Sequence, residues 1–388
     1  LFSFIYKRLS LNRQTITTMI NYGKQNINQD DIDSVIEVLK SDFLTQGPKV
    51  PEFEEDLKRY CQVKYSKVVS NATSALHLAY LAVGLQKGDI VWTSPNTFVS
   101  TANAALYCGA TVDFVDIDPN TYNISIDCLK EKLVQAKKDN KLPKLVVPVH
   151  FAGQSCNMEE IWELSKEYEF KVVEDASHAL GGKYKGEKIG NCKYSDMAVF
   201  SFHPVKMITT GEGGAVTTNS KSLDEKVSLL RTHGITKDPS QFDSKPHGDW
   251  YYEQQSLGYN YRLTEIQAAL GISQLKRLDS FVSKRKEIAE FYLQNLDKKI
   301  TPIQLSDTNS SWHLFVVQVN NRQKIYQQLK DSGIQSQVHY IPVNSQPFYN
   351  HKNLPNCETF YERCLSLPIY FDLTKEQCKQ VVSCINHD

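Results

Sequence analysis

The chain has 388 residues, with 44 lysines and arginines against 44 aspartates and glutamates, and 41% of its residues are hydrophobic. This length suffices for one large and one smaller domain. The balanced charge gives no overall field for nucleic acid or an anionic membrane, and no apolar run reaches the roughly 18 residues of a membrane helix. The nine cysteines are scattered without a C-x-x-C pair. This argues against a disulfide scaffold or a zinc site and favours a reducing cytoplasm.

Residues 1–18 differ in composition from the rest of the chain. They carry Lys7, Arg8 and Arg13, no acidic residue, and several serines and threonines. A targeting peptide is one interpretation, but the segment lacks a clear apolar region or cleavage site. We expect a disordered extension that plays no part in the fold.

Short β-branched segments alternate with helical patterns between about residues 65 and 220. The predicted strands are Lys67–Ser70, Ile90–Thr93, Thr111–Val115, Leu145–Val149, Lys171–Glu174, Met197–Phe200 and Ala215–Thr218. The predicted helices between the earlier strands are Ser74–Val83, Ser100–Tyr107, Asp127–Ala136 and Met158–Tyr168. This alternation predicts an α/β fold with a mostly parallel, seven-stranded, doubly wound sheet. Ligands of such sheets bind beyond the carboxyl ends of the strands, so we expect Asn71, Asp175 and Ser201 to converge on one crevice.

The pattern changes in the second half of the chain. Residues 237–256 are rich in turn formers and predict a long surface loop. Helices are predicted at Glu265–Leu278 and Val282–Leu296, and a smaller α+β unit follows with strand Leu314–Val319, helix Gln323–Lys330, strand Gln335–Tyr340 and helix Lys375–Ile385. We expect a large domain over residues 19–270 and a smaller C-terminal domain over 271–388.

Lys206 is the principal catalytic candidate. It follows a short apolar strand and leads into the glycine-rich turn at residues 209–214. Most lysines are surface charges, but apolar neighbours on both sides predict burial, which lowers the pKa of an ammonium group and frees the amine to bond a carbonyl. Asp175 ends an apolar strand, where it is either a helix cap or the partner of a protonated pyridine nitrogen. Together the two residues indicate a pyridoxal 5'-phosphate (PLP) site.

Other residues are candidates for holding this cofactor. The segment Asn71–Ser74 enters a helix, and its small residues, Ala72 among them, would let backbone N–H groups approach a phosphate, to which Thr73 and Ser74 would donate their hydroxyls. A plain helix cap is the alternative. Ser201 would donate a further hydrogen bond to the phosphate.

Three more side chains have two interpretations each. His178 would contact the phenolic oxygen of the cofactor or be structural, and Phe98 would stack on the pyridine ring or belong to the core. Glu212 would contact the substrate or cap a turn. No metal ligand is expected among these residues.

Six motifs in chain order resemble the nucleotide-sugar aminotransferases of the DegT/DnrJ/EryC1/StrS family. They begin at Asn71, Glu174, Phe200, Gly211, Gly258 and Val338, and the resemblance runs from about Ile20 to the end. It implies the fold-type I architecture, a homodimer with shared active sites, and Asn260 and Arg262 reaching the cofactor phosphate of the neighbouring subunit. It also implies that His339 and Tyr340 face the sugar nucleotide. The structural alternative for Asn260 and Arg262 is that they lead into a helix. For His339 and Tyr340 the alternative is an ordinary edge strand.

The sequence around Lys206 further resembles family members of pseudaminic acid biosynthesis. These transfer an amino group from L-glutamate to C4 of a UDP-linked 4-keto-6-deoxy-N-acetylhexosamine. Alternatives within the family are a transaminase for another sugar carbon or nucleotide, and a sugar dehydratase, against which Lys206 argues because dehydratases carry histidine there. A non-catalytic PLP-binding regulator and a sheet protein without cofactor are the remaining alternatives.

Overall fold

The computed structural model describes residues 19–349 and 354–386. The expected extension at residues 1–18 lies outside the described residues. The centre of the molecule is a seven-stranded sheet in the order β1-β9-β8-β5-β4-β2-β3. Its strands are β1 (Tyr65–Val69), β2 (Ile90–Thr93), β3 (Thr111–Phe114), β4 (Leu145–Val147), β5 (Lys171–Asp175), β8 (Met197–Ser201) and β9 (Gly214–Thr218). Strand β9 runs antiparallel to both its neighbours, and the other neighbouring pairs are parallel.

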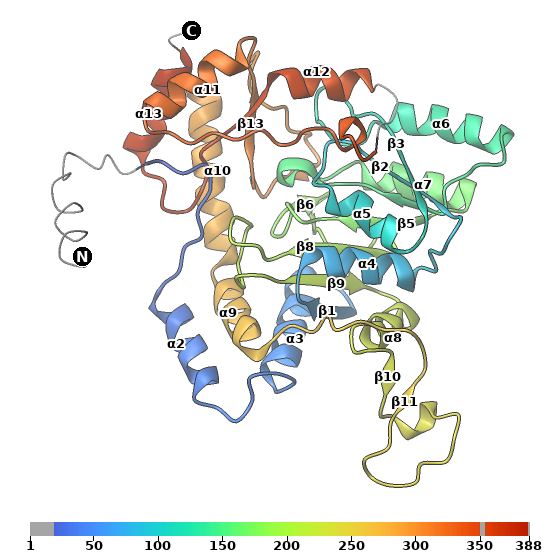
Figure 1. Cartoon of the computed structure of the whole chain (residues 1–388). Coiled ribbons are helices and arrows are strands. Elements are labelled where there is room, and N and C mark those ends of the chain that lie inside the picture. The colour runs from blue at the N-terminus through green and yellow to red at the C-terminus, as the bar shows by residue number, and fades with distance from the viewer. Residues whose placement is uncertain (1–18, 350–353, 387–388) are drawn as a thin grey trace, which may run out of the picture.

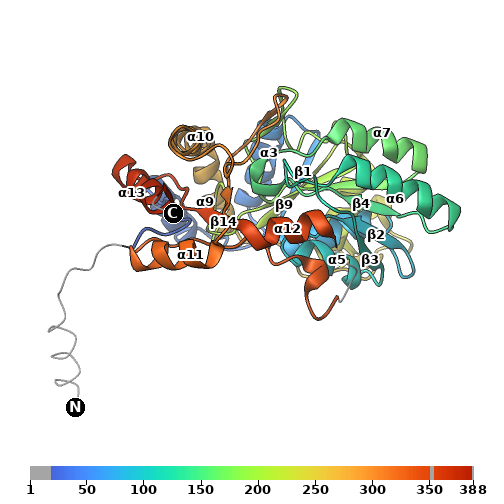
Figure 2. The same ribbon diagram turned by 90° about the horizontal axis from the view of Figure 1, so that it is seen from above.

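Helices cover both faces of this sheet (Figures 1 and 2). One face carries α4 (Ala72–Ala82), α5 (Ser100–Tyr107) and α8 (Lys221–Leu230). The other face carries α3 (Lys49–Cys61), α6 (Ile126–Lys138), α7 (Met158–Tyr168) and α9 (Glu265–Lys276). The central strands β8 and β9 are buried along their whole length because both of their faces are covered.

The C-terminal part forms its own apolar cluster beside the sheet. Its elements are α10 (Leu278–Asn295), β13 (Phe315–Gln318), α11 (Arg322–Asp331), α12 (Pro355–Arg363), β14 (Cys364–Leu367) and α13 (Lys375–Asn386). Strands β13 and β14 pair antiparallel, and Ile20 from the N-terminal segment packs into this cluster. The segment after Ile20 leads from the C-terminal cluster down beside α10 to α2 (Gln29–Leu39), which packs against α9 (Figure 1).

The minor elements lie at the edges of this framework. They are the strands β6 (Lys183–Tyr184), β7 (Glu187–Lys188), β10 (Ile235–Thr236), β11 (Glu253–Gln254) and β12 (Thr308–Asn309), and the 3-10 turns η1 (Phe151–Gly153), η2 (Pro239–Gln241) and η3 (Val343–Ser345). Strands β10 and β11 pair at the base of the predicted loop at 237–256, which projects from the body of the protein (Figure 1). None of the helices in the described ranges is long and apolar enough to cross a membrane.

The predicted fold class and the seven sheet strands are confirmed, with strand ends that differ by up to two residues. The strand predicted at Gln335–Tyr340 is wrong, since only single bridges form, between Ile334 and Ile20 and between Gln337 and Ser366. The backbone there pairs first with the N-terminal segment and then with β14, so no continuous ladder of hydrogen bonds forms with either segment. Helices α2, α3, α8 and α12 and strand β14 were not predicted.

Candidate active site

Lys206 lies in a closed loop between two central strands. The loop leaves β8 and returns to β9, and Phe202 closes its base by accepting from Thr210 N at 3.0 Å and donating to Gly213 O at 2.9 Å. Met207 and Ile208, which follow the lysine, are buried. The apolar residues around the lysine therefore anchor the loop in the core and fix the point from which its side chain emerges.

The amine of Lys206 is largely withdrawn from water. Burial lowers the pKa of Lys206 to about 8, against an opposing effect of the Asp175 carboxylate. Its Nζ lies 3.5 Å from Nε2 of His313. Burial also lowers the pKa of His313, to well below the usual value of a histidine. A neutral imidazole is thus the neighbour of Lys206, and with a pKa of about 8 roughly a tenth of the amine is unprotonated at pH 7.

Asp175 is the last residue of β5 and is only 4% exposed. Its Oδ2 accepts a 2.6 Å hydrogen bond from Thr101 Oγ1 in α5, and its Oδ1 accepts from Ser177 N at 3.2 Å. Both donors are neutral. A buried carboxylate held only by neutral donors favours a cationic ligand, which a pyridinium N–H would supply.

The amino end of α4 meets the glycine-rich turn. Asn71 caps the helix by accepting from Ser74 N at 2.8 Å, and Ala72 and Thr73 are the first two helical residues. The N–H groups of a first turn have no carbonyl partner inside their helix, so they are available to an anion. A Cβ at Gly214 would lie 2.7 Å from Ala72 N, so only glycine lets β9 pass this close to the helix end.

His178, His339 and Tyr340 meet beside these groups. His178 Nε2 lies 3.0 Å from Tyr340 OH, and the two rings are stacked. The His178 ring also lies 4.5 Å from that of His313. His339 is anchored by a 2.8 Å hydrogen bond between Nδ1 and Ser366 Oγ, and burial, with Lys206 adding to the effect, lowers the pKa of His339 to about 3.

The remaining predicted residues are placed as follows. Phe98 is 58% exposed, so the core interpretation is wrong, and its ring lies 6.3 Å from that of Tyr340. Ser201 ends β8 and is buried, with Oγ accepting from His203 N at 3.4 Å. Glu212 is exposed, and its carbonyl accepts from Thr210 Oγ1 and Gln267 Nε2.

Asn260 and Arg262 lie on the extended segment that leads into α9. Asn260 bridges Thr232, and Arg262 bridges Val69 at the end of β1. Asn260 is exposed and Arg262 is partly buried. Their contact with a neighbouring subunit stays a prediction.

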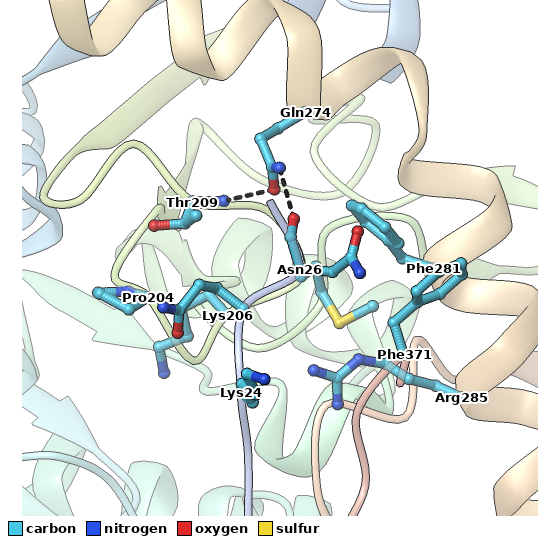
Figure 3. Close-up of a pocket in the computed structure, with 11 residues that line it drawn as sticks. Lys24, Asn26, Pro204, Lys206, Thr209, Gln274, Phe281, Arg285 and Phe371 are labelled. Carbon is cyan, nitrogen blue, oxygen red and sulfur yellow. Dashed lines mark hydrogen bonds between the residues drawn. The ribbon is translucent and has the colours of Figure 1, made fainter. Parts of the chain in front are cut away.

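Three site residues were missed in the sequence. Thr101 and His313 contact the two catalytic candidates, and Arg285 holds His313 in place by donating from Nη1 to the carbonyls of His313 at 3.1 Å and Ile369 at 2.8 Å. Arg285 also lines a pocket beside the Lys206 loop together with Lys24 and Gln274 (Figure 3). These residues come from helices or loops far from the recognised motifs, and no local pattern distinguishes them.

The residues present fit PLP. Lys206 offers an amine with a lowered pKa, Asp175 offers a buried carboxylate without a cationic hydrogen-bond donor, and the amino end of α4 offers N–H groups beside Gly214. These three features match the aldehyde, the ring nitrogen and the phosphate of the cofactor.

Comparisons with known proteins agree with this site. The model of the DegT/DnrJ/EryC1/StrS aminotransferase family matches residues 25–386. The UDP-4-amino-4,6-dideoxy-N-acetyl-beta-L-altrosamine transaminase of Campylobacter jejuni (strain 81-176) is 43% identical over 375 residues, covering 94% of this chain and 96% of its own.

Two solved structures are similar in fold. Helicobacter pylori PseC, an aminotransferase involved in the biosynthesis of pseudaminic acid, superposes with a TM-score of 0.87 at 34% identity and covers 95% of this chain and 99% of its own. The PMP form of Spr1654, a putative sugar aminotransferase from Streptococcus pneumoniae, gives a TM-score of 0.85 at 28% identity, covering 94% and 98%. The chain therefore belongs to the DegT/DnrJ/EryC1/StrS aminotransferase family and is a PLP-dependent sugar aminotransferase.

Proposed function

We propose that this chain transfers the amino group of L-glutamate to the C4 ketone of a UDP-linked 4-keto-6-deoxy-N-acetylhexosamine. The product would be the 4-amino sugar nucleotide of pseudaminic acid biosynthesis. The similarity over almost the whole chain to the Campylobacter jejuni transaminase and to PseC supports this choice of substrate. The observation that carries the reaction class is the partly buried Lys206, whose pKa is lowered to about 8 and whose Nζ lies 3.5 Å from Nε2 of His313.

Bound PLP supplies an aldehyde for the covalent bond and an electron-withdrawing ring for the reaction. Lys206 would hold the cofactor through that aldehyde, and the incoming amino group of glutamate would free the lysine amine. The freed Nζ then acts as the base that removes the α-proton of glutamate, and in the second half it delivers a proton to C4 of the sugar. A pKa near the working pH suits a group that both takes and gives a proton, and burial supplies that value.

Asp175 and the end of α4 orient the cofactor in this proposal. Asp175, fixed by Thr101, holds the ring nitrogen in its protonated form. Ala72 and Thr73 with Ser201 bind the phosphate, while Asn260 and Arg262 of a second subunit complete that cradle. His178 would meet the phenolic oxygen, and Phe98, whose side chain is exposed, would stack on the ring.

His339, Tyr340 and the exposed Glu212 would bind the sugar nucleotide. Burial keeps His339 neutral near pH 7, since its pKa is lowered to about 3. A neutral imidazole and a phenol recognise sugar hydroxyl and amide groups by hydrogen bonds and give no charge to attract water. Which ketone reaches the cofactor is then decided by the orientation of the sugar in this pocket.

A homodimer is part of the proposal. Helix α2 packs its buried residues Asp31 and Val38 inward, yet Ile32, Ile36 and Leu39 are between 38% and 56% exposed. Phe43 and Leu44, which follow the helix, are about half exposed. An apolar surface of this kind on a helix supports coverage by a second copy.

The location of the chain is also part of the proposal. The nine cysteines are free thiols, which supports a reducing cytoplasmic location.

The test is a half-reaction assay followed by product analysis. The purified chain with PLP is given glutamate, and conversion of the cofactor to its amine form is followed by absorbance. UDP- and dTDP-linked 3-keto and 4-keto sugars are then offered, and products are identified by mass spectrometry and NMR. We expect amination at C4 of the UDP-linked N-acetyl sugar. Amination of another sugar would replace the proposed substrate, and a chain that binds PLP without reacting with glutamate would be a regulator instead.

A further inference from the structure

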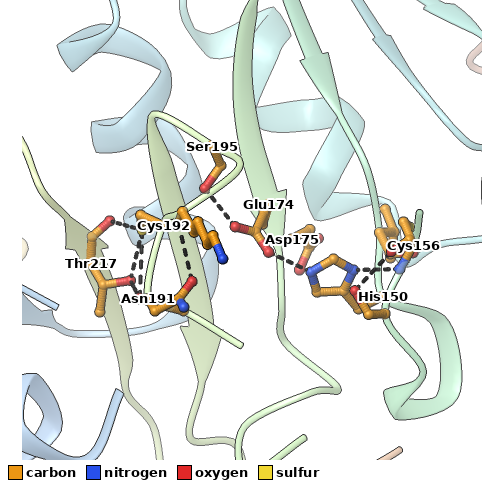
Figure 4. A network of polar contacts seen from close by, with 12 residues as sticks. His150, Cys156, Glu174, Asp175, Asn191, Cys192, Ser195 and Thr217 are labelled. Atoms are coloured by element: carbon orange, nitrogen blue, oxygen red, sulfur yellow. Dashed lines mark hydrogen bonds and ion pairs between the residues drawn. The ribbon is translucent and has the colours of Figure 1, made fainter. Parts of the chain in front are cut away.

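A buried polar network lies behind the catalytic end of β5. His150 Nε2 lies 2.6 Å from Oε2 of Glu174, and Ser195 Oγ donates to Glu174 Oε1 at 2.5 Å (Figure 4). His150 is fully buried and Glu174 is 5% exposed. Burying a carboxylate costs free energy that an apolar side chain of similar size would avoid, so this pair is a poor way to gain stability alone.

The hydrogen bonds determine where the His150 ring carries its proton. Cys156 N donates to Nδ1 of His150 at 3.1 Å, so Nδ1 must be unprotonated. The contacts with Cys156 and Glu174 raise the pKa of His150 to about 10 against the lowering effect of burial, but a second proton on Nδ1 would face the Cys156 N–H that Nδ1 accepts. The ring therefore carries its proton on Nε2 and donates it to Glu174, which accepts two hydrogen bonds.

His150 begins the turn η1, which lies over the end of β5. Its backbone N–H donates to the carbonyl of Asp175 at 3.1 Å. Two residues later, Ala152 N donates to Nδ1 of His178 at 3.3 Å. His178 Nδ1 is therefore unprotonated as well, and its Nε2–H is directed to Tyr340 OH at 3.0 Å. The turn thus sets the tautomer of His178.

This turn is not a conformation that the chain adopts by local preference. Ala152 has a φ of 57°, in the left-handed region that disfavours residues with a Cβ. Gly153 follows with a φ of 103°, and a Cβ there would lie 2.4 Å from Ser311 Oγ. A strained turn persists only where its surroundings hold it. The side chain of His150, fixed by Glu174, is one hydrogen-bonded anchor at its start, and Asn123 Oδ1, which accepts from Phe151 N at 2.9 Å, is another.

We propose that Glu174 and His150 are a positioning pair for the active site. Glu174 holds the His150 ring, the ring fixes the turn at 150–153, and the Ala152 N–H keeps His178 in the Nε2–H tautomer that faces Tyr340. Neither residue touches the substrate. The consequence for catalysis rests on the proposed function, whereas the tautomer of His178 does not depend on it.

The test compares two substitutions at one position. Glu174→Leu removes the acceptor of both hydrogen bonds. Glu174→Gln keeps an amide oxygen that can accept from His150, and its amide NH2 can donate to Ser195 Oγ. Chains labelled with ¹⁵N-histidine are studied without cofactor by long-range ¹H–¹⁵N correlation, which distinguishes the two tautomers, and the His178 signals are assigned by their loss in His178→Gln. We expect a single Nε2–H tautomer in the wild type and in E174Q, and a mixture of tautomers in E174L.

Activity is the second readout. Loss of comparable orienting hydrogen bonds costs about 10–100-fold in activity, so we expect kcat of E174L to fall by about that factor, with KM little changed and E174Q close to wild type. A folded E174L that keeps the single tautomer would overturn the proposal, as would an E174Q that behaves like E174L. If E174L does not fold, His150→Ala takes its place and is judged by the same spectra. A chain inactive on every sugar refutes the proposed function but leaves these spectra interpretable.

Discussion

Thr101 and Asp175 are joined by a buried 2.6 Å hydrogen bond that links helix α5 to the end of β5. The hydroxyl donates to one carboxylate oxygen, and Thr101 Oγ1 also lies 2.8 Å from the hydroxyl of Thr97. Both threonines are almost completely buried. The orientation of the carboxylate that we assign to the cofactor nitrogen is thus set from a helix on one face of the sheet.

The hydroxyl of Thr101 is expected to contribute to cofactor affinity. Thr101→Val keeps the shape of the side chain but leaves Asp175 without its stronger donor, and a hydrogen bond to a charged group contributes about 1.5–3 kcal/mol. We expect PLP to bind about 10–100-fold more weakly, measured by fluorescence titration of the apo chain. Thr97→Val, which leaves the bond to Asp175 in place, is the control. Equal affinities in T101V and wild type would contradict the assigned role of this contact.

Replacement of Lys206 is expected to abolish covalent attachment of the cofactor. In Lys206→Ala, borohydride treatment with PLP should give no mass increase at this position, whereas the wild-type chain should gain one reduced pyridoxyl group. Loss of the base should lower turnover by at least about 10²–10⁴-fold. Lys24→Ala, at an exposed lysine near the same pocket, controls for non-specific labelling. Labelling of K206A at wild-type stoichiometry would exclude Lys206 as the attachment site.

The reactivity of Lys206 should depend on pH with a midpoint near 8. Below this pH the ammonium form predominates and cannot attack an aldehyde, and above it the free amine does. The rate at which the apo chain bonds PLP should therefore rise through about pH 8. Asp175 raises the pKa of Lys206, so Asp175→Asn should move this midpoint to lower pH. A midpoint near 10.4, the ordinary value of lysine, would show that the amine is not buried in solution.

Gly214 tests the predicted phosphate cradle. Gly214→Ala would place a Cβ 2.7 Å from Ala72 N and from the carbonyl carbon of Asn71, so the end of α4 must shift. We expect this variant to bind PLP more weakly, and to bind inorganic phosphate more weakly when phosphate competes with PLP. The affinity for pyridoxal, which has no phosphate, should fall less. Gly23→Ala is the matched control because its nearest neighbour would lie at 3.7 Å. An unchanged PLP affinity in a folded G214A would argue against this cradle.

The exposed apolar face of α2 tests the proposed dimer. Ile36→Glu places a charge on this face, which should weaken dimer formation strongly. The chain should then be mostly monomeric at micromolar concentrations. Sedimentation velocity would show a shift from dimer to monomer, and the monomer should lose activity if Asn260 and Arg262 complete the site of the partner. Glu37→Gln on the same helix is the control. An I36E chain that stays dimeric would place the interface elsewhere.

The α/β fold, the strands of the central sheet and the position of Asn71, Asp175 and Ser201 at or just after the ends of strands followed from the amino-acid sequence alone. Buried strands and their following turns are local patterns, and ligands of parallel sheets bind where those strands end. The motif residues therefore pointed to PLP before any geometry was known.

The distant side chains that complete the site became visible in the folded protein. Thr101, His313 and Arg285 act through contacts across 28 to 107 residues of chain, and their local sequence resembles that of ordinary helix or loop residues. The predicted strand at Gln335–Tyr340 failed for the same reason, since its backbone partners are the N-terminal segment and β14. The periodicity of apolar residues indicates which side of a helix or strand is buried. The pairing of distant segments and the tautomers of His150 and His178 depend instead on tertiary packing, which no local sequence pattern contains.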